Sequence, residues 1–253
     1  MAFKIMIDLE TINNPDNPAP VPASARPLLG QRRRPRQEPA KASSFPGASH
    51  WQIVAFGVAV IDEHHVQKIT TIAGSEREMV EKFVRSIKRD DTVLSYNGRG
   101  FDLPVVDARC FHYGISWPWY HGGMGFDPKY RYKIDHHYDL MDYLSGFGAT
   151  RQTSMNAAAR AMGLPGKGSV SGANVEVLWA AGEHRLVNLY VCDDVAQQSA
   201  IYLRTELLRG TINLSTYQAA IRQWMIVAEA AVPGILDRCD LPTLTLAGEA
   251  GGQ

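Results

Sequence analysis

The chain has 253 residues, with 26 Lys+Arg against 26 Asp+Glu, so its formal net charge is 0. Hydrophobic residues make up 45% and charged residues 21%, which excludes a disordered, collagen-like or coiled-coil protein and fits one large globular domain or at most two. A neutral chain cannot coat nucleic acid in bulk, so any such contact must come from a local patch. Cys110, Cys192 and Cys239 are widely spaced and form no CxxC pair, which argues against a disulfide framework and a zinc ribbon.

No targeting signal stands out in the sequence. No apolar run reaches about 18 residues, so we expect no membrane span. The first eight residues, Met-Ala-Phe-Lys-Ile-Met-Ile-Asp, turn acidic and carry no cleavage-site pattern, so they predict a strand rather than a signal peptide. We therefore expect a protein of the reducing cytoplasm.

Strand patterns dominate the first half of the chain. Runs rich in Val and Ile predict strands at residues 3–8, 53–61, 66–72 and 92–96, with the second and third forming a hairpin. Helical spacing of apolar residues predicts a helix at 76–89, and Pro104 suits the first turn of another that ends near His112. Residues 117–133 are aromatic and glycine-rich, which is typical of a loop.

Helical patterns dominate the second half. We expect helices at residues 139–144, 154–162, 183–209 and 215–229, a loop at 166–172 and a fraying glycine-rich end. Strands followed by helices favour a mixed α/β fold. We divide the chain into one domain at residues 1–210 and a C-terminal helix and tail at 211–253.

Residues 13–50 interrupt the first domain. They hold eight of the fourteen prolines and a basic run of Arg32, Arg33, Arg34 and Arg36. Such a segment cannot bury enough apolar surface to offset the entropy of ordering it, so we predict a disordered insertion. It is either a solvated spacer or a basic arm that touches phosphates.

Two carboxylates, Asp8 and Glu10, close the first predicted strand. Strand alternation puts them on one face, with Leu9 on the other. Mutual repulsion and desolvation make two ionised carboxylates costly at such a position, and a hard divalent cation relieves both. The motif alone also fits a solvated strand end.

Two later motifs carry further acids. Asp102 ends the segment Asn-Gly-Arg-Gly-Phe-Asp between a predicted strand and helix, where it either faces a ligand or caps the helix. Tyr190 and Asp194 are four residues apart on the long predicted helix and share a face, which could also be simply solvated. The neighbouring Asp193 could compete with Asp194. Four carboxylates that converge would have few stable explanations other than a pair of metal ions.

The order Asp-x-Glu, Asn-x-x-x-Phe-Asp and Tyr-x-x-x-Asp resembles the DEDD superfamily of 3′–5′ exonucleases in its tyrosine branch (DEDDy), which includes the proofreading domains of DNA polymerases. Residues 96–104, 130–132 and 139–142 are similar to predicted 3′–5′ exonucleases related to family-B polymerases. The resemblance covers roughly residues 4–210. It implies a ribonuclease-H-like fold, a mixed sheet of about five strands flanked by helices.

The resemblance also implies a two-metal hydrolysis of phosphodiester bonds. The ligands of two Mg²⁺ or Mn²⁺ ions would be Asp8, Glu10, Asp102 and Asp194. Tyr190 would orient the attacking water, because its ordinary pKa of about 10 makes full proton abstraction difficult. The substrate would be the 3′ end of single-stranded DNA or RNA, and the product a 5′-nucleotide.

Three residues are candidates for contact with nucleic acid: Asn97, Phe101 and Lys167. Phe101 could instead be a core residue under the sheet. Two other functions stay open, namely a non-catalytic nucleic-acid-binding module of the same fold and an enzyme that uses the same metals on short oligonucleotides or internal bonds. The histidine pairs at 64–65 and 136–137 lack zinc-ligand spacing and predict exposed polar loops.

Overall fold

The structure, a computed structural model, describes residues 2–17, 47–122, 127–167 and 172–247. The basic run at 32–36 and residues 18–46 of the predicted disordered insertion lie outside these residues, as does the glycine-rich end. The prediction of disorder was wrong at both ends of the insertion, because Asn13 belongs to the first strand and Ala48–His50 form a 3-10 turn. The two ends of the insertion lie side by side, because the Asn14 backbone N–H donates to the His50 carbonyl at 2.8 Å. The insertion therefore leaves and re-enters the fold at one point.

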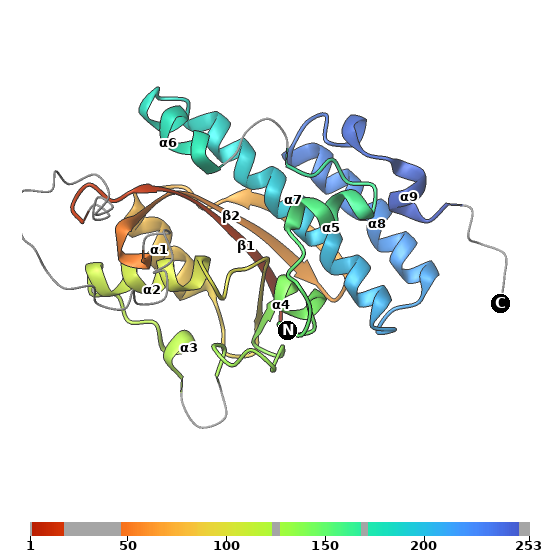
Figure 1. Cartoon of the computed structure of the whole chain (residues 1–253), viewed down its shortest axis with the longest axis horizontal. Coiled ribbons are helices and arrows are strands. Elements are labelled where there is room, and N and C mark those ends of the chain that lie inside the picture. The colour runs from red at the N-terminus through yellow and green to blue at the C-terminus, as the bar shows by residue number, and fades with distance from the viewer. Residues whose placement is uncertain (1, 18–46, 123–126, 168–171, 248–253) are drawn as a thin grey trace, which may run out of the picture.

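A five-stranded mixed sheet in the order β3-β2-β1-β4-β5 forms the centre of the described structure (Figure 1). Its strands are β1 (Lys4–Asn13), β2 (Trp51–Asp62), β3 (His65–Thr71), β4 (Thr92–Ser95) and β5 (His137–Asp139). The β1–β2 and β2–β3 pairs are antiparallel, whereas β1–β4 and β4–β5 are parallel. This arrangement confirms the predicted mixed α/β class.

Helices cover both faces of the sheet (Figure 1). They are α1 (Glu76–Ser86), α2 (Asp102–Tyr113), α3 (Pro118–His121), α4 (Leu140–Leu144), α5 (Met155–Ala161), α6 (Gly172–Ala180), α7 (His184–Leu208), α8 (Leu214–Ala231) and α9 (Leu241–Thr245), with short 3-10 turns η2 (Ala48–His50) and η3 (Leu236–Arg238). In the described part of the chain, no helix combines the length and the hydrophobicity that crossing a membrane requires.

The side-chain alternation of β1 decides which layer each residue meets. Ile5, Ile7 and Leu9 pack into the core that β1 shares with α1 and α2. Met6 packs into the opposite core, beneath α7 and α8. By the same alternation, Asp8 and Glu10 point toward α7.

The long helix α7 is the main support on that side of the sheet. It is buried along most of its 25 residues, from Val187 to Glu206. Helix α8 holds it from outside, with the Trp224 indole N–H donating to the Ala196 carbonyl at 2.9 Å. A helix packed on several sides can place its side chains firmly against the sheet.

Several predicted elements differ from the observed ones. The expected helix at 139–144 begins at Leu140, because His137–Asp139 pairs with β4 as a strand too short to show a pattern. The expected loop at 117–133 contains α3. Helices α6 and α9 and the η2 and η3 turns were not predicted. Strand β1 continues to Asn13 rather than ending at residue 8, and α1 ends at Ser86 rather than at residue 89. The prediction for 136–137 was wrong for His137, which is buried and bonds Ser95 at 2.8 Å.

Candidate metal centre

Three acidic side chains from two elements meet over the sheet. Asp8 and Glu10 from β1 and Asp194 from α7 each offer a carboxylate oxygen, and these atoms lie within 4.8 Å of one another. Glu10 and Asp194 are buried and Asp8 is half-buried. Three carboxylates placed together away from water repel one another and are costly to ionise, so this cluster has the composition of a cation site.

A glycine brings α7 close enough for this meeting. Gly57 of β2 is the direct strand partner of Asp8. A Cβ atom on Gly57 would lie 2.8 Å from Cγ2 of Val195, which is closer than real Cβ contacts allow. Without a side chain at Gly57, α7 packs directly on the strand, and Asp194 lies next to Asp8.

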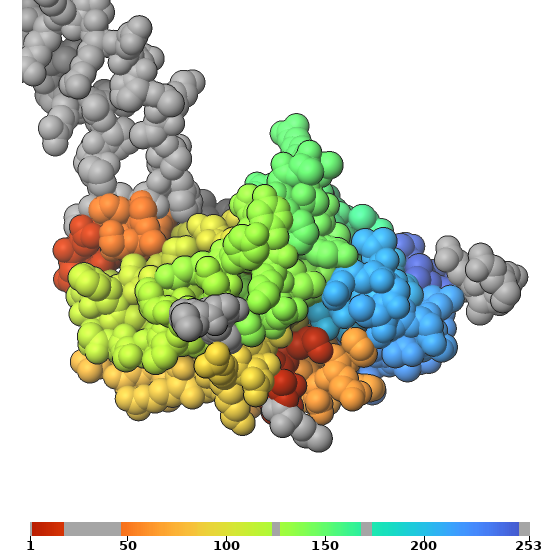
Figure 2. Space-filling view, turned by 90° about the horizontal axis from the view of Figure 1, so that it is seen from below, coloured from red at the N-terminus to blue at the C-terminus, as the bar shows by residue number. Residues whose placement is uncertain are grey.

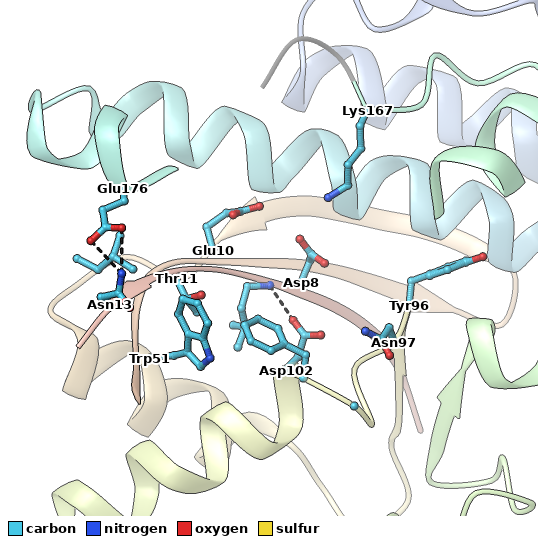
Figure 3. A pocket seen from close by; sticks show the side chains of 14 residues that line it. Asp8, Glu10, Thr11, Asn13, Trp51, Tyr96, Asn97, Asp102, Lys167 and Glu176 are labelled. Atoms are coloured by element: carbon cyan, nitrogen blue, oxygen red, sulfur yellow. Dashed lines mark hydrogen bonds between the residues drawn. The ribbon is translucent and has the colours of Figure 1, made fainter. Parts of the chain in front are cut away.

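Asp102 approaches the same cavity from the other side. It is the first residue of α2, and its Oδ1 accepts a hydrogen bond from the Leu9 backbone N–H at 3.0 Å (Figure 3). The helix N-cap is Phe101, so the capping role considered for Asp102 is not the one observed. Asp102 lines the same pocket as Asp8 and Glu10, although it is not part of the 4.8 Å cluster.

The turn that carries Asp102 is held by a second acid, Asp139 at the end of β5. Its two carboxylate oxygens accept the backbone N–H groups of Asn97 and Arg99, each at 2.9 Å. Asn97 has a left-handed φ of 68°, so these hydrogen bonds stabilise a conformation that is uncommon for a residue with a side chain. From the sequence, Asp139 was expected to begin a helix and to belong to a motif that resembles the exonuclease family, and no role in the turn was predicted for it. No local pattern indicates that role, because the strand that ends at Asp139 has only three residues.

Tyr190 and Asp193 flank Asp194 on α7 but face different surroundings. Tyr190 is buried one turn before Asp194 and its ring lies 5.6 Å from the Lys167 ammonium. Burial first, and then the charge of Asp194, raise the pKa of the Tyr190 phenol to about 12. Asp193 instead forms an ion pair with Arg238 at 3.0 Å. The geometry therefore separates Asp193 from the acidic cluster.

Lys167 supplies the cation nearest to the cluster in the described structure. Its ammonium lies 3.1 Å from Asp194 Oδ2 and reaches into the cavity opposite Asp102 (Figure 3). Its neighbour Gly166 is fixed to α7, because the Gly166 N–H donates to Gln197 Oε1 at 2.8 Å. Asp194 Oδ1, by contrast, is buried without a hydrogen-bond partner among the described residues, which leaves one oxygen available to a ligand.

The acidic side chains have pKa values far above their usual range. Burial raises the pKa of Glu10 to about 8, that of Asp102 to about 7 and that of Asp194 to about 6. Burial, followed by repulsion from Asp194, Asp102 and Glu10, raises the pKa of Asp8 well above its ordinary value. Lys167 opposes these increases. The cluster thus holds protons at neutral pH that a divalent cation could displace.

The cluster opens into a pocket of about 700 Å³ that extends along β1. Its far end is lined by Asn13 and Glu176, which are hydrogen-bonded at 3.1 Å (Figure 3). Phe101 and Trp51 also line it, with ring centroids 5.9 Å apart and edge to face. Phe101 is half-buried, so it packs on the core and also borders the cavity. Asn97 lies at the rim.

Comparison with known families places this geometry in context. A family model described as predicted 3′–5′ exonucleases related to the exonuclease domain of PolB matches residues 43–231, which is more than half of the chain. The chain belongs to this family. The match includes Asp102, Tyr190 and Asp194, and it begins after Asp8 and Glu10.

Relatives of this family member include DNA polymerases. The chain is 40% identical over 60 residues to a DNA polymerase of Pyrococcus glycovorans, covering 23% of this chain and 8% of the polymerase. It is 32% identical over 69 residues to a DNA polymerase of Methanocaldococcus jannaschii, covering 27% of this chain and 4% of the polymerase. These matches therefore span only a small part of each polymerase.

A solved structure shows the same fold. The family B DNA polymerase from the hyperthermophilic archaeon Pyrobaculum calidifontis aligns with a TM-score of 0.50 and 18% identity, covering 94% of this chain and 29% of that one. The described sheet and its flanking helices are consistent with a ribonuclease-H-like exonuclease fold. The expected relationship to exonucleases of family-B polymerases is confirmed.

Proposed function

We propose that this protein is a divalent-metal-dependent 3′–5′ exonuclease that acts on single-stranded nucleic acid. The observation that carries the proposal is the meeting of Asp8, Glu10 and Asp194 within 4.8 Å at one end of a pocket. Membership of a family of predicted exonucleases supports the reaction class. The acidic cluster supports the dependence on metal.

The chemistry of these donors fits Mg²⁺ or Mn²⁺. The cluster offers carboxylate oxygens, the ligand type that hard divalent cations prefer, and Asp194 Oδ1 has no other partner among the described residues. Asp8, Glu10 and Asp194 would hold the metal together with Asp102 from the opposite wall. When bound, two such ions activate a water molecule and stabilise the departing 3′-oxygen of a phosphodiester.

The remaining residues of the site position the reactants. Because the raised pKa keeps the Tyr190 phenol protonated at neutral pH, Tyr190 orients the attacking water by hydrogen bonding rather than by removing its proton. The Lys167 ammonium, which lies over the Tyr190 ring and beside Asp194, can contact a phosphate oxygen once metal offsets the charge of Asp194. Phe101 and Trp51 offer aromatic surface to a base, and such contacts tolerate any sequence. Asn97 is exposed and lines the pocket, so it can contact a bound nucleic acid.

The test is cleavage of a 5′-labelled oligonucleotide with a free 3′-OH in the presence of Mg²⁺ or Mn²⁺. The proposal predicts a ladder of products shortened one nucleotide at a time, and no cleavage with chelator. Asp8→Ala and Asp194→Ala should abolish the ladder. Asp193→Ala is the matched control, since this neighbouring acid on α7 pairs with Arg238 outside the cluster, and it should keep activity.

Each alternative function has its own outcome in this assay. Binding without cleavage in any metal would indicate a non-catalytic module. Cleavage of a circular single strand would indicate an endonuclease, because such a substrate has no 3′ end. Activity confined to a dinucleotide would indicate a phosphodiesterase of short oligonucleotides. Full activity of Asp8→Ala and Asp194→Ala would reject the proposed site.

A further inference from the structure

Five consecutive residues between α3 and β5 alternate cationic and aromatic side chains, in the order Lys129-Tyr130-Arg131-Tyr132-Lys133. All five are exposed. Tyr130 exposes 54% of its surface and Tyr132 exposes 62%, which is unusual for such large side chains. Neither tyrosine lines the pocket of the acidic cluster, so their exposure needs an explanation of its own.

Ring contacts make these tyrosines one surface, which we call the tyrosine platform (Tyr130, Tyr132 and Phe147). The Tyr130 and Tyr132 centroids lie 5.7 Å apart and the Tyr132 and Phe147 centroids 5.4 Å apart. Phe147 comes from the turn after α4 and has a left-handed φ of 58°. Two separate turns of the chain therefore contribute rings to one patch.

Ion pairs tie the platform to the rim of the pocket. Arg131 between the tyrosines lies 3.2 Å from Asp142 Oδ1, and Arg99 lies 2.9 Å from the other oxygen of the same carboxylate. Arg99 belongs to the turn whose Asn97 and Gly100 line the pocket. In Figure 2 the yellow-green and green segments that carry these groups lie side by side on one face. The platform is thus linked through Asp142 and Arg99 to the turn that lines the pocket.

The balance of charged side chains around the tyrosine platform indicates whether it suits phosphates or bases. Three acids, Asp127, Asp135 and Asp142, lie among the four cations Lys129, Arg131, Lys133 and Arg99. Lys129 is also engaged, at 3.3 Å from His121 Nδ1 and above the Tyr120 ring. Cations exceed acids by only one, so the patch is a poor site for a bare polyanion such as a duplex backbone. Exposed rings favour a ligand that presents flat bases, which single strands do.

We propose that the tyrosine platform binds bases of the single strand upstream of the 3′ end that occupies the pocket. The inference rests on the proposed function for the direction of the strand, but it concerns a separate surface. Stacking on Tyr130 and Tyr132 would hold the substrate between successive cleavage steps. The platform would therefore matter more for long substrates than for those that end inside the pocket.

The experiment measures binding separately from cleavage. Fluorescence anisotropy in chelator, with labelled oligothymidylate and oligouridylate of about 20 nucleotides, gives the Kd of the full chain without turnover. Removal of both rings in Tyr130→Ala/Tyr132→Ala should raise Kd about tenfold or more, as expected for lost base stacking. Tyr130→Phe/Tyr132→Phe should bind within about twofold of the natural protein, because the rings remain. The two probes differ in the sugar and in the thymine methyl group, so equal Kd values would show that neither affects binding.

A matched control removes a different exposed ring. Phe111 is 92% exposed on α2, and Phe111→Ala should leave Kd unchanged. In the presence of metal, the ratio of kcat/KM for a long strand over a trinucleotide should fall in the double alanine variant. An unchanged Kd in that variant, or an equal loss in Phe111→Ala, would overturn the inference. Tyrosine-dependent binding without any cleavage would instead support the platform and reject the proposed exonuclease activity.

Discussion

The Leu9 backbone N–H donates a hydrogen bond to Asp102 Oδ1 at 3.0 Å, joining two residues 93 positions apart in sequence. Leu9 stands between Asp8 and Glu10 on β1, so this bond fixes the first turn of α2 directly beside the acidic cluster. Asp102 thereby has two separable properties: an oxygen that satisfies a buried N–H, and a negative charge.

Two substitutions separate these properties. Asp102→Asn keeps an acceptor oxygen for Leu9 and removes the charge, whereas Asp102→Ala removes both. We expect both variants to lose nuclease activity to background. The free energy of unfolding of Asp102→Ala should be about 1–3 kcal/mol lower than that of Asp102→Asn, because the buried Leu9 N–H is left without a partner. Urea denaturation measures the difference. Equal stability of the two would show that the bond contributes nothing.

The raised carboxyl pKa values predict an unusual pH dependence of the metal-free protein. Glu10 titrates at about 8, Asp102 at about 7 and Asp194 at about 6 when folded, against ordinary values of 4.5, 3.8 and 3.8. Between pH 4 and 8 the folded state therefore binds more protons than the unfolded state, so these groups make stability fall as pH rises. Thermal melting in chelator should show a lower Tm at pH 8 than at pH 5.5.

Metal should reverse this trend. Mn²⁺ bound at the proposed site would displace protons from the cluster, so its stabilising effect should be larger at pH 8 than at pH 5.5. Asp8→Asn/Asp194→Asn is the control. Its Tm should not rise with Mn²⁺, and its fall between pH 5.5 and pH 8 should be smaller but still present, because Glu10 and Asp102 remain buried. A Tm shift with Mn²⁺ that is the same at both pH values would contradict the shifted titrations.

Lys167 forms an ion pair with Asp194, one of the proposed metal ligands, so it would compete with a bound cation. Its ammonium is 3.1 Å from Asp194 Oδ2 and lowers the pKa of that carboxyl against the effect of burial. Lys167→Met should therefore reduce the stability of the metal-free protein at pH 8 and strengthen Mn²⁺ binding severalfold, as titration calorimetry would measure. Lys129→Met, which removes a lysine distant from the acids in sequence and absent from the pocket lining, serves as the control. Weaker Mn²⁺ binding in Lys167→Met would contradict this prediction and show that Lys167 favours binding of the metal.

A buried network supports the sheet behind the site. Glu76 accepts the Ile53 N–H at 2.7 Å and pairs with the buried Arg109 at 2.7 Å. Glu76→Ala should lower the free energy of unfolding by about 3–5 kcal/mol, because it leaves a buried guanidinium uncompensated. Glu81→Ala on the same helix removes exposed pairs with Arg77 and Arg85 and should cost less than about 1 kcal/mol. A similar loss of unfolding free energy in both variants would show that the buried pair of Glu76 with Arg109 stabilises the protein no more than an exposed pair does.

The sequence predicted the elements whose patterns are long. Alternation in β1 placed Asp8 and Glu10 on one face, and the spacing of Tyr190 and Asp194 placed both on one helix, as the structure has them. Strand β5 was missed because three residues cannot display a period. Helix α6 was missed because it has only nine residues and shows little separation of polar and apolar faces. Helix α7 shows as little separation, but its 25 residues were long enough to indicate a helix.

Contacts between distant segments could not be predicted from local pattern. Nothing near Asp193 or Asp194 in the sequence tells which one Arg238 neutralises. Nor does the sequence show that Gly57 sits under Val195 or that Asp139 holds Asn97. These relations depend on how the sheet orders its strands, which only the three-dimensional structure provides.

The central claim is that Asp8, Glu10 and Asp194 together hold a catalytic divalent cation. Anomalous diffraction from crystals soaked in Mn²⁺ tests it most directly, with Asp194→Asn crystals treated in the same way. We predict a manganese peak bounded by the three carboxylates, with the Lys167 ammonium moved away from Asp194, and a weak or missing peak in the variant. The claim would be contradicted if soaked crystals of the natural protein showed no manganese peak at the three carboxylates and Lys167 kept its ion pair with Asp194.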